Sequence, residues 1–234
     1  MTFRFRPVLT LSALAALAVL LSLGFWQLQR LEWKQDLIAK TEARTQAAPI
    51  AFAEAMRATL DDRDIEYTPV AVTGRFRHDQ EVHVFGALNG AAGVFVFTPL
   101  ETRDGAIVYV NRGFAPQALK KAEDRAAGQI TGEVRIVGLL RLPEAEDKLI
   151  RTENDIAGNL WHERRPIAFA KAQDIAAAAF YLDSLGEENA APWPKGGVTR
   201  LDFSNRHFEY AWTWFGLAGA LVGVYLAFSV RRNS

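Results

Sequence analysis

The sequence predicts a membrane protein in which two transmembrane helices flank one mainly β extramembrane domain, an α+β domain built as an antiparallel sheet or barrel with short helices. Three observations lead to this prediction. A long uncharged segment lies near each end of the chain, every Asp and Glu lies between these segments, and the region between them contains short stretches of alternating apolar and polar residues. Alternation is typical of half-buried strands, and a long uncharged run is typical of a membrane span.

The charge distribution separates the ends of the chain from its middle. The 234 residues include 27 basic and 27 acidic side chains and no cysteine. All 27 acids lie between Glu32 and Glu209, together with 23 of the basic residues, so the middle carries a net charge of −4. An acidic middle excludes the basic surface of a nucleic-acid-binding protein. The lack of cysteine excludes disulfides, thiolate metal sites, a thiol nucleophile and the attachment of a c-type heme.

The first predicted span covers residues 8–28. Its uncharged run, Val8–Trp26, has nineteen residues, and at about 1.5 Å per residue it matches a hydrocarbon layer about 30 Å thick. A cleaved signal peptide is the alternative, because Arg4 and Arg6 resemble its basic start. The run is longer than the usual ~7–15 residues of such a peptide and no small-residue cleavage site follows it directly, so a retained anchor is favoured. Three apolar residues continue the helical spacing beyond the span: Leu28, Leu31 and Ile38.

The second predicted span covers residues 208–230. Its uncharged run, Tyr210–Val230, has 21 residues, too long for an ordinary buried helix of a soluble protein. Aromatic residues at its start suit the membrane interface. Gly219 and Gly223 form a G-x-x-x-G pair that lets another helix approach closely, and packing against the first span is the simplest use of it.

Basic residues on the outer flanks predict the orientation. Arg4 and Arg6 precede the first span, and Arg231 and Arg232 follow the second, with no acid beside them. The positive-inside rule then places residues 1–7 and 231–234 in the cytoplasm and the domain of residues 29–207 outside. The few residues before the first span are too short for a mitochondrial transit peptide. We therefore expect a bacterial inner membrane protein with a periplasmic domain.

Strand and turn signals fill the first part of the middle region. Residues 49–60 predict a short amphipathic helix, and Tyr67–Phe76 alternates as a strand does. Val82 and Val84 repeat this period beyond a polar turn, which predicts a hairpin with the strand before it. The pair Asp104-Gly105 predicts a second hairpin, between residues 93–100 and 106–110.

The second part is less regular. Residues 132–142 alternate again and predict a strand, whereas the Ala-rich segment of residues 166–180 has helical spacing. Residues 186–197 predict a loop, followed by a short strand over residues 198–203. Short connections between the early strands favour an antiparallel arrangement over an α/β fold.

Searches for catalytic motifs find little. The sequence has no P-loop, no G-x-G-x-x-G and no G-x-S-x-G. His162-Glu163 starts like the zinc motif H-E-x-x-H, but Pro166 occupies the second ligand position. His78 and His83 lie around a predicted turn, where solvated side chains are the simpler interpretation. A membrane-anchored metal-dependent hydrolase that uses these three histidines is therefore the weakest hypothesis.

His207 lies three residues before the uncharged run of the second span. A helix that begins one turn earlier would place His207, Tyr210, Ala211, Trp214 and Ala218 on one face. Imidazole is a common axial ligand of heme iron, and the small and aromatic residues could contact an apolar macrocycle. The alternative is an interfacial histidine that hydrogen bonds to lipid headgroups or to the domain, and from this residue alone the alternative ranks first.

Five short blocks occur in the same order as in a known family. Residues 24–34 (GFWQLQRLEWK) resemble its signature G-x-W-Q-x-x-R-x-x-W-K. Residues 69–76 (PVAVTGRF) and 110–116 (VNRGFAP) resemble P-V-x-V-x-G-x-F and V-N-R-G-W-V-P. Residues 138–144 (GLLRLPE) and 205–214 (NRHFEYAWTW) resemble G-x-x-R-x-P-E and N-N-H-L-x-Y-A-x-T-W. Through these blocks the chain resembles the Surfeit locus protein one family, the Shy-type assembly factors of cytochrome c oxidase.

The resemblance implies an oxidase assembly factor rather than an enzyme. Bacterial members bind heme a and pass it toward the catalytic subunit, so heme a is the expected cofactor and that subunit the expected partner. A heme a synthesis enzyme and membrane lipid are further expected partners. His207 matches the family histidine implicated in heme binding, and Arg30 suits a heme propionate. The other expected cofactor-binding residues are Trp26, Gln27, Tyr210 and Trp214.

One alternative accompanies this expectation. The chain could instead be a membrane-anchored scaffold that stabilises oxidase subunits without binding a cofactor, in which case His207 would be structural. Departures from the family pattern at Arg206, Phe208, Phe114 and Ala115 concern details of the pocket rim. For Asn111, Arg112 and Gly113 we expect a structural role, in a turn at a strand end.

Overall fold

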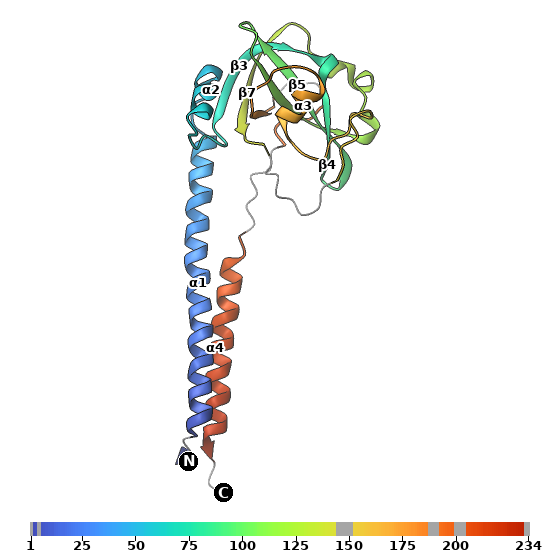
Figure 1. Cartoon of the computed structure of the whole chain (residues 1–234). Helices are drawn as coiled ribbons and strands as arrows, with labels where there is room; N and C mark the ends of the chain where they lie inside the picture. Colours follow the sequence, from blue (N-terminus) through green and yellow to red (C-terminus); the bar gives the residue numbers. More distant parts are fainter. Residues whose placement is uncertain (1, 4–5, 144–151, 187–191, 199–204, 232–234) are drawn as a thin grey trace. The chain divides into compact units, whose positions relative to one another are not determined.

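The computed structural model describes residues 2–3, 6–143, 152–186, 192–198 and 205–231. The chain divides into two compact units. The first consists of Met1–Glu42 and Asp202–Ser234, and the second of Ala43–Leu201. Figure 1 shows the helices of the first unit and the strands of the second.

Two long helices form the first unit. Helix α1 spans Pro7–Thr45 and helix α4 spans His207–Ser229, and both are long and apolar enough to cross a membrane. The 39 residues of α1 correspond to about 58 Å, which exceeds the ~30 Å of a hydrocarbon layer. The prediction that the first span continues as a helix is therefore confirmed. The two helices run side by side (Figure 1), and strand β1 (Thr2–Phe3) pairs antiparallel with β9 (Val230–Arg231) at one end of the pair.

A closed five-stranded barrel forms the second unit. The hydrogen-bonded order is β3-β7-β8-β6-β5, and β5 pairs back to β3. The strands of this ring are β3 (Pro69–Phe76), β5 (Ala91–Thr102), β6 (Ile107–Pro116), β7 (Glu133–Arg141) and β8 (Tyr181–Ser184). Two further strands extend it: β2 (Ile50–Ala51) lies parallel to β3, and β4 (Val82–Leu88) lies antiparallel to β5. The predicted fold class is confirmed, except that β6 and β8 run parallel.

The two predicted hairpins have different outcomes. Strands β5 and β6 form the hairpin predicted at Asp104-Gly105, where Gly105 has a φ of +82°. The hairpin predicted between β3 and β4 is wrong, because β3 pairs with β7 and β5 whereas β4 pairs with β5. The tight turn that joins β4 to β5 is Asn89-Gly90, with positive φ at both residues. An Asn-Gly pair is a strong hairpin signal, so the sequence did contain the correct turn.

Short helices connect the strands. They are α2 (Phe52–Leu60), α3 (Pro166–Ala172) and the 3-10 helices η1 (His78–Gln80), η2 (Gln117–Leu119) and η3 (Ala122–Gly128). Helix α3 is much shorter than the helix predicted over residues 166–180, and strand β8, which follows that segment, was not predicted. The strand predicted over residues 198–203 lies almost entirely outside the described residues.

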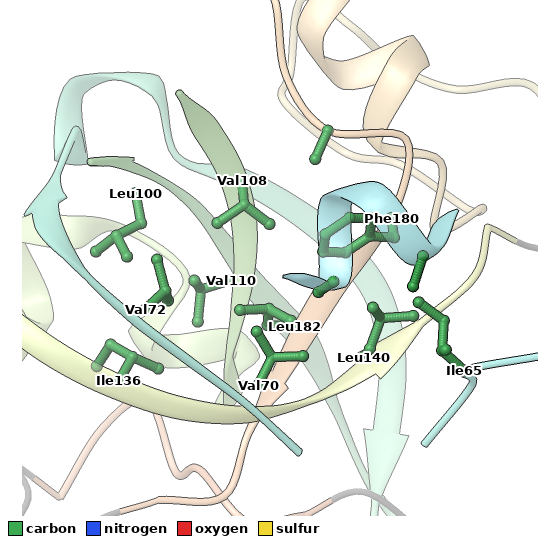
Figure 2. Packing of buried hydrophobic residues seen from close by; sticks show 13 residues of the cluster. Ile65, Val70, Val72, Leu100, Val108, Val110, Ile136, Leu140, Phe180 and Leu182 are labelled. Carbon is green, nitrogen blue, oxygen red and sulfur yellow. The ribbon is translucent and has the colours of Figure 1, made fainter. Parts of the chain in front are cut away.

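The barrel interior is filled by aliphatic side chains (Figure 2). The inward residues of each strand alternate with outward ones, as strand geometry requires. They include Val70 and Val72 of β3 and Ile136 and Leu140 of β7, all 8% exposed or less. Helix α2 packs on the same cluster through Ala55 and Ala58, which are fully buried. A separate aromatic cluster contains Phe97, Tyr109, Trp161, Phe169 and Tyr181.

Residues Asn111, Arg112 and Gly113 form an irregularity within β6, and the expectation of a turn at a strand end is wrong. The register between β5 and β6 shifts at this place, which is typical of a β-bulge. Asn111 accepts a hydrogen bond from the Gly113 backbone (3.1 Å) and donates one to Asp183 (2.7 Å). Gly113 has a φ of +116°, and a Cβ there would overlap the Lys195 carbonyl oxygen. Only glycine fits, because Phe114 and Lys195 exchange backbone hydrogen bonds beside it.

Candidate functional site

A hydrogen bond joins the two membrane-length helices at one end. The imidazole Nδ1 of His207, the first residue of α4, lies 2.8 Å from Oε1 of Gln27 in α1. Gln27 directly follows the uncharged run of the first span, and His207 shortly precedes that of the second. Because an amide oxygen only accepts, Nδ1 carries the proton in this bond, and in the neutral ring Nε2 then has the lone pair. Helix α4 includes His207, as the shared face of His207, Tyr210 and Trp214 requires, and the neutral ring has one nitrogen able to bind a metal.

Small residues allow the helices to approach next to this bond. A Cβ at the buried Gly24 would lie 2.6 Å from a ring carbon of Phe215, so the missing side chain makes room for that ring. Phe25 packs against the edge of the same ring, with centroids 5.5 Å apart. Ala211 and Ala218 are buried at 1% and 4% exposure. The predicted packing role of Gly219 and Gly223 is wrong, because a Cβ at either glycine would meet nothing within 4 Å among the described residues.

The remaining predicted site residues lie on the same two helices, and no contact of theirs with His207 is seen among the described residues. Tyr210 and Trp214 follow His207 by one and two helical turns, which places them on its face of α4. Tyr210 is 51% exposed and Trp26 is 52% exposed. The guanidinium of Arg30 lies 4.3 Å from the centre of the Trp33 ring. The structure thus brings together His207 and Gln27, while Arg30 lies over an aromatic ring of its own helix.

A second polar contact joins the helices near their other ends. Thr10 Oγ1 and the Tyr225 hydroxyl lie 2.8 Å apart. Thr10 and Gln27 are separated along α1 by about 26 Å, from the rise of an α-helix. Sequence analysis did not identify this pair. Each apolar run contains several hydroxyl side chains, and the sequence does not tell which of them meet.

The histidines of the barrel are engaged in structural contacts. His83 Nε2 donates to the Glu81 carboxylate at 2.6 Å, and Arg125 donates to both oxygens of that carboxylate. His162 packs against the Phe85 ring. In the part of the chain that the structure describes, no three His, Cys, Asp or Glu side chains are grouped so as to hold a metal ion. These contacts give the hydrolase hypothesis no support.

His78 provides a pH-dependent contact. Its Nε2 donates to the Ile130 carbonyl at 2.8 Å, and its Nδ1 accepts from Arg112 at 3.5 Å. Burial lowers the pKa of His78 below its ordinary value. The hydrogen bond to the Ile130 carbonyl raises this pKa in part, and the Arg112 cation lowers it further. The folded protein therefore holds fewer protons on this ring than the unfolded chain does, so its contribution to stability is complete above pH ~6.5 and is lost as the pH falls below that value.

We expect the melting temperature of the wild-type protein to fall more than that of His78→Gln when the pH is lowered from about 7.5 to about 5.5. Glutamine can keep the bond to the Ile130 carbonyl but does not titrate. Melting curves of the two proteins at each pH measure the difference, and the other histidines contribute equally to both. Parallel curves across this range would show that His78 is protonated as easily in the folded state as in the unfolded chain.

The chain has two helices able to span a membrane, and a histidine–glutamine contact joins them. A closed five-stranded barrel lies between them in the sequence. These features define a membrane-anchored barrel protein. The sequence model of the SURF1 family matches residues 14–219. Surfeit locus protein 1 of Mus musculus is 35% identical over an alignment that covers 92% of this chain and 74% of that protein. The Homo sapiens protein of that name is 34% identical over 85% of this chain and 70% of its own length. The chain therefore belongs to the SURF1 family, and the family resemblance of the sequence blocks is confirmed.

Proposed function

We propose that this protein is an assembly factor for cytochrome c oxidase that binds heme a and assists its insertion into the catalytic subunit. Membership in the SURF1 family supports the assembly role. His207 carries the proposal of heme binding, because its ring is oriented by Gln27 through Nδ1 at 2.8 Å. The proposal includes the bacterial inner membrane as the location, with both termini in the cytoplasm and the barrel in the periplasm, as the flanking arginines indicate.

The arrangement of His207 suits an iron ligand. A ligating histidine usually donates its other ring N–H to an oxygen, which fixes the ring and makes the ligating nitrogen more basic. Gln27 supplies that oxygen here. In the proposal, Nε2 of His207 binds the iron of heme a, which is cargo carried by the protein rather than a reagent that it uses. A neutral imidazole of this kind is a common axial ligand.

The neighbouring side chains suit the rest of a heme. Trp26 precedes Gln27 in α1 and Tyr210 follows His207 by one turn of α4, and both expose aromatic surface; Trp214 lies further along the same face of α4. Arg30 has an exposed guanidinium, and among the described ion pairs none includes it, so it is available to a propionate. These residues would bind and orient the cargo, and no proton or electron transfer is assigned to them. A heme a synthesis enzyme would supply the heme and the oxidase catalytic subunit would receive it, with lipid around the helices.

A scaffold without cofactor is the second candidate, and one observation favours it. The His207–Gln27 hydrogen bond joins α1 to α4, which is a sufficient structural role for the histidine. In that case the protein would hold oxidase subunits together, and His207 would contribute only to the pairing of its own helices.

The visible spectrum of the full-length protein tests the proposal. The protein is purified in detergent from a host that makes heme a and, as the control, from the same host without heme a synthesis. We expect about one heme a per chain from the first host and none from the second. A protein free of heme from both hosts that still restores oxidase assembly in cells would contradict heme binding and support the scaffold.

A further inference from the structure

The short strand β8 leaves an opening in the side of the barrel. Strand β7 pairs with β8 only over Gly138–Arg141, the Leu185 backbone adds one bond to the Val137 carbonyl, and residues 133–136 of β7 extend past their neighbour. A cavity of about 360 Å³ lies there, bounded by β7, by the end of β8 and by residues 193–196. Small-molecule sites commonly have volumes of about 300–1,000 Å³. The cavity is therefore large enough for a small ligand.

A buried cation lies at this cavity. Arg112 of β6 lines it, is only 8% exposed, and has its guanidinium 4.9 Å from the centre of the Phe76 ring. The guanidinium donates to the Gly128 carbonyl and, at 3.5 Å, to His78 Nδ1. Both acceptors are uncharged. Among the ion pairs of the described residues, none includes Arg112.

This arrangement is unusual for a buried charge. Buried guanidinium groups are normally paired with a carboxylate, because desolvating an unpaired charge is costly. The nearby Glu81 is already bonded to Arg125 and His83. Burial accordingly lowers the pKa of Arg112 to about 10. A guanidinium has five N–H donors, and those not used by Gly128 and His78 remain for a ligand.

The other lining residues of the cavity also suit an anion that carries an apolar group. Arg135 adds a second cation, and the described residues that line the cavity include no Asp or Glu. Ser184 adds a hydroxyl at the end of β8. The apolar part of the lining is formed by side chains that include Phe76, Ile130, Ile136 and Trp193. The lining therefore combines two cations with apolar side chains, and the Arg112 cation lies directly beside the Phe76 ring.

We propose that this cavity is a binding site for a small organic anion, a phosphate or carboxylate group attached to an apolar body, with the oxyanion on Arg112 and the apolar body against Phe76 and Trp193. Guanidinium groups bind such oxyanions through paired N–H donors. The same chemistry is offered by a soluble metabolite and by the headgroup of an anionic lipid. The site lies wholly in the barrel unit and does not depend on His207, so it stands independently of the proposed function.

Titration calorimetry on the full-length protein in a nonionic detergent tests this site. The main probe is phenyl phosphate, with inorganic phosphate and benzyl alcohol as probes that carry only the anion or only the ring. Dihexanoyl phosphatidic acid is the lipid probe. We expect phenyl phosphate to bind at least tenfold more tightly than either partial probe. Binding of the lipid probe alone, if it requires Arg112, would support the site and identify a lipid as the source of the anion.

Three variants assign the binding to the cavity. Arg112→Gln is expected to weaken binding of the preferred probe at least tenfold, and Leu185→Trp, at a half-exposed lining position, to weaken it by filling the cavity. Arg75→Gln is the matched control, because Arg75 lies on the same strand as Phe76 but lines a different cavity. Circular dichroism establishes that each variant is folded, and Leu185→Trp carries the test if Arg112→Gln is not. No binding of any probe, or equal binding by the folded variants and the control, would overturn the proposal.

Discussion

Replacing His207 with alanine is expected to reduce the heme a content of the purified protein at least tenfold. The variant removes the only histidine in the described parts of α1 and α4, and with it the Nε2 lone pair that Gln27 leaves available. The heme content is measured from the visible spectrum of protein from a host that makes heme a. His78→Ala is the matched control, because His78 belongs to the barrel unit and should leave the heme content unchanged.

A second substitution separates ligation from helix pairing. In His207→Gln, the side-chain amide can still donate to the Gln27 oxygen but offers no imidazole to iron. If His207 binds heme, both the alanine and the glutamine variants lose the heme signal. If His207 only joins the helices, the glutamine variant keeps normal oxidase assembly and the alanine variant is the more impaired. Normal heme content in both variants would show that iron is bound elsewhere.

The second large effect is expected on stability, when the buried carboxylate of Glu81 loses its arginine partner. Arg125 donates to both oxygens of Glu81, and these side chains are only 1% and 5% exposed. Burial alone would raise the pKa of Glu81, but the hydrogen bonds from His83 and Arg125 outweigh burial and hold it below its ordinary value. Arg125→Met would leave a buried carboxylate that has lost its cation. We expect the free energy of unfolding to fall by about 3–5 kcal/mol, the usual cost of breaking a buried ion pair.

Chemical denaturation of the full-length protein, followed by circular dichroism, measures this effect. Arg103→Met is the control, because Arg103 pairs with Glu133 on the surface with its side chain 81% exposed. Exposed pairs contribute little to stability, so the control should unfold with the wild-type midpoint. A midpoint for Arg125→Met equal to that of the control would show that Glu81 is neutral or reached by water in the folded protein.

Local signals in the sequence predicted which segments form strands and helices better than which strands pair with each other. The turn Asp104-Gly105 fixed one hairpin because the two strands follow each other directly. The alternation of β4 indicated a strand but contained no information on its neighbour. Strand β8 was missed because it has four residues and buries Tyr181, Leu182 and Asp183 in succession, so it does not alternate. Helix α3 ends early although alanines continue, because Asp174 has a φ of +52°, and further on the Ala178 backbone donates to the Ile107 carbonyl.

The sequence named candidate site residues one by one but did not show which of them lie in contact. The position of His207 at the start of a helix follows from the uncharged run after it. Its partner Gln27 is 180 residues away in the sequence, and spacing alone does not relate residues on different helices. Arg112 was expected to lie in a turn at a strand end. The sequence does not show that β8 stops beside this residue, or that its guanidinium has no carboxylate partner among the described ion pairs.

The place of β8 in the ring affects when the barrel can fold during synthesis. Residues 181–184 lie between β7 and β6, so β8 pairs with strands that precede it by about 40 and 70 residues. Pairings between such distant segments form slowly, because a long loop must be closed first. Until β8 emerges, β6 and β7 each keep an unpaired edge, and unpaired edges tend to bind other chains. Ring closure is thus a late step of synthesis, and a chain that stops before Tyr181 should aggregate rather than form a smaller stable domain.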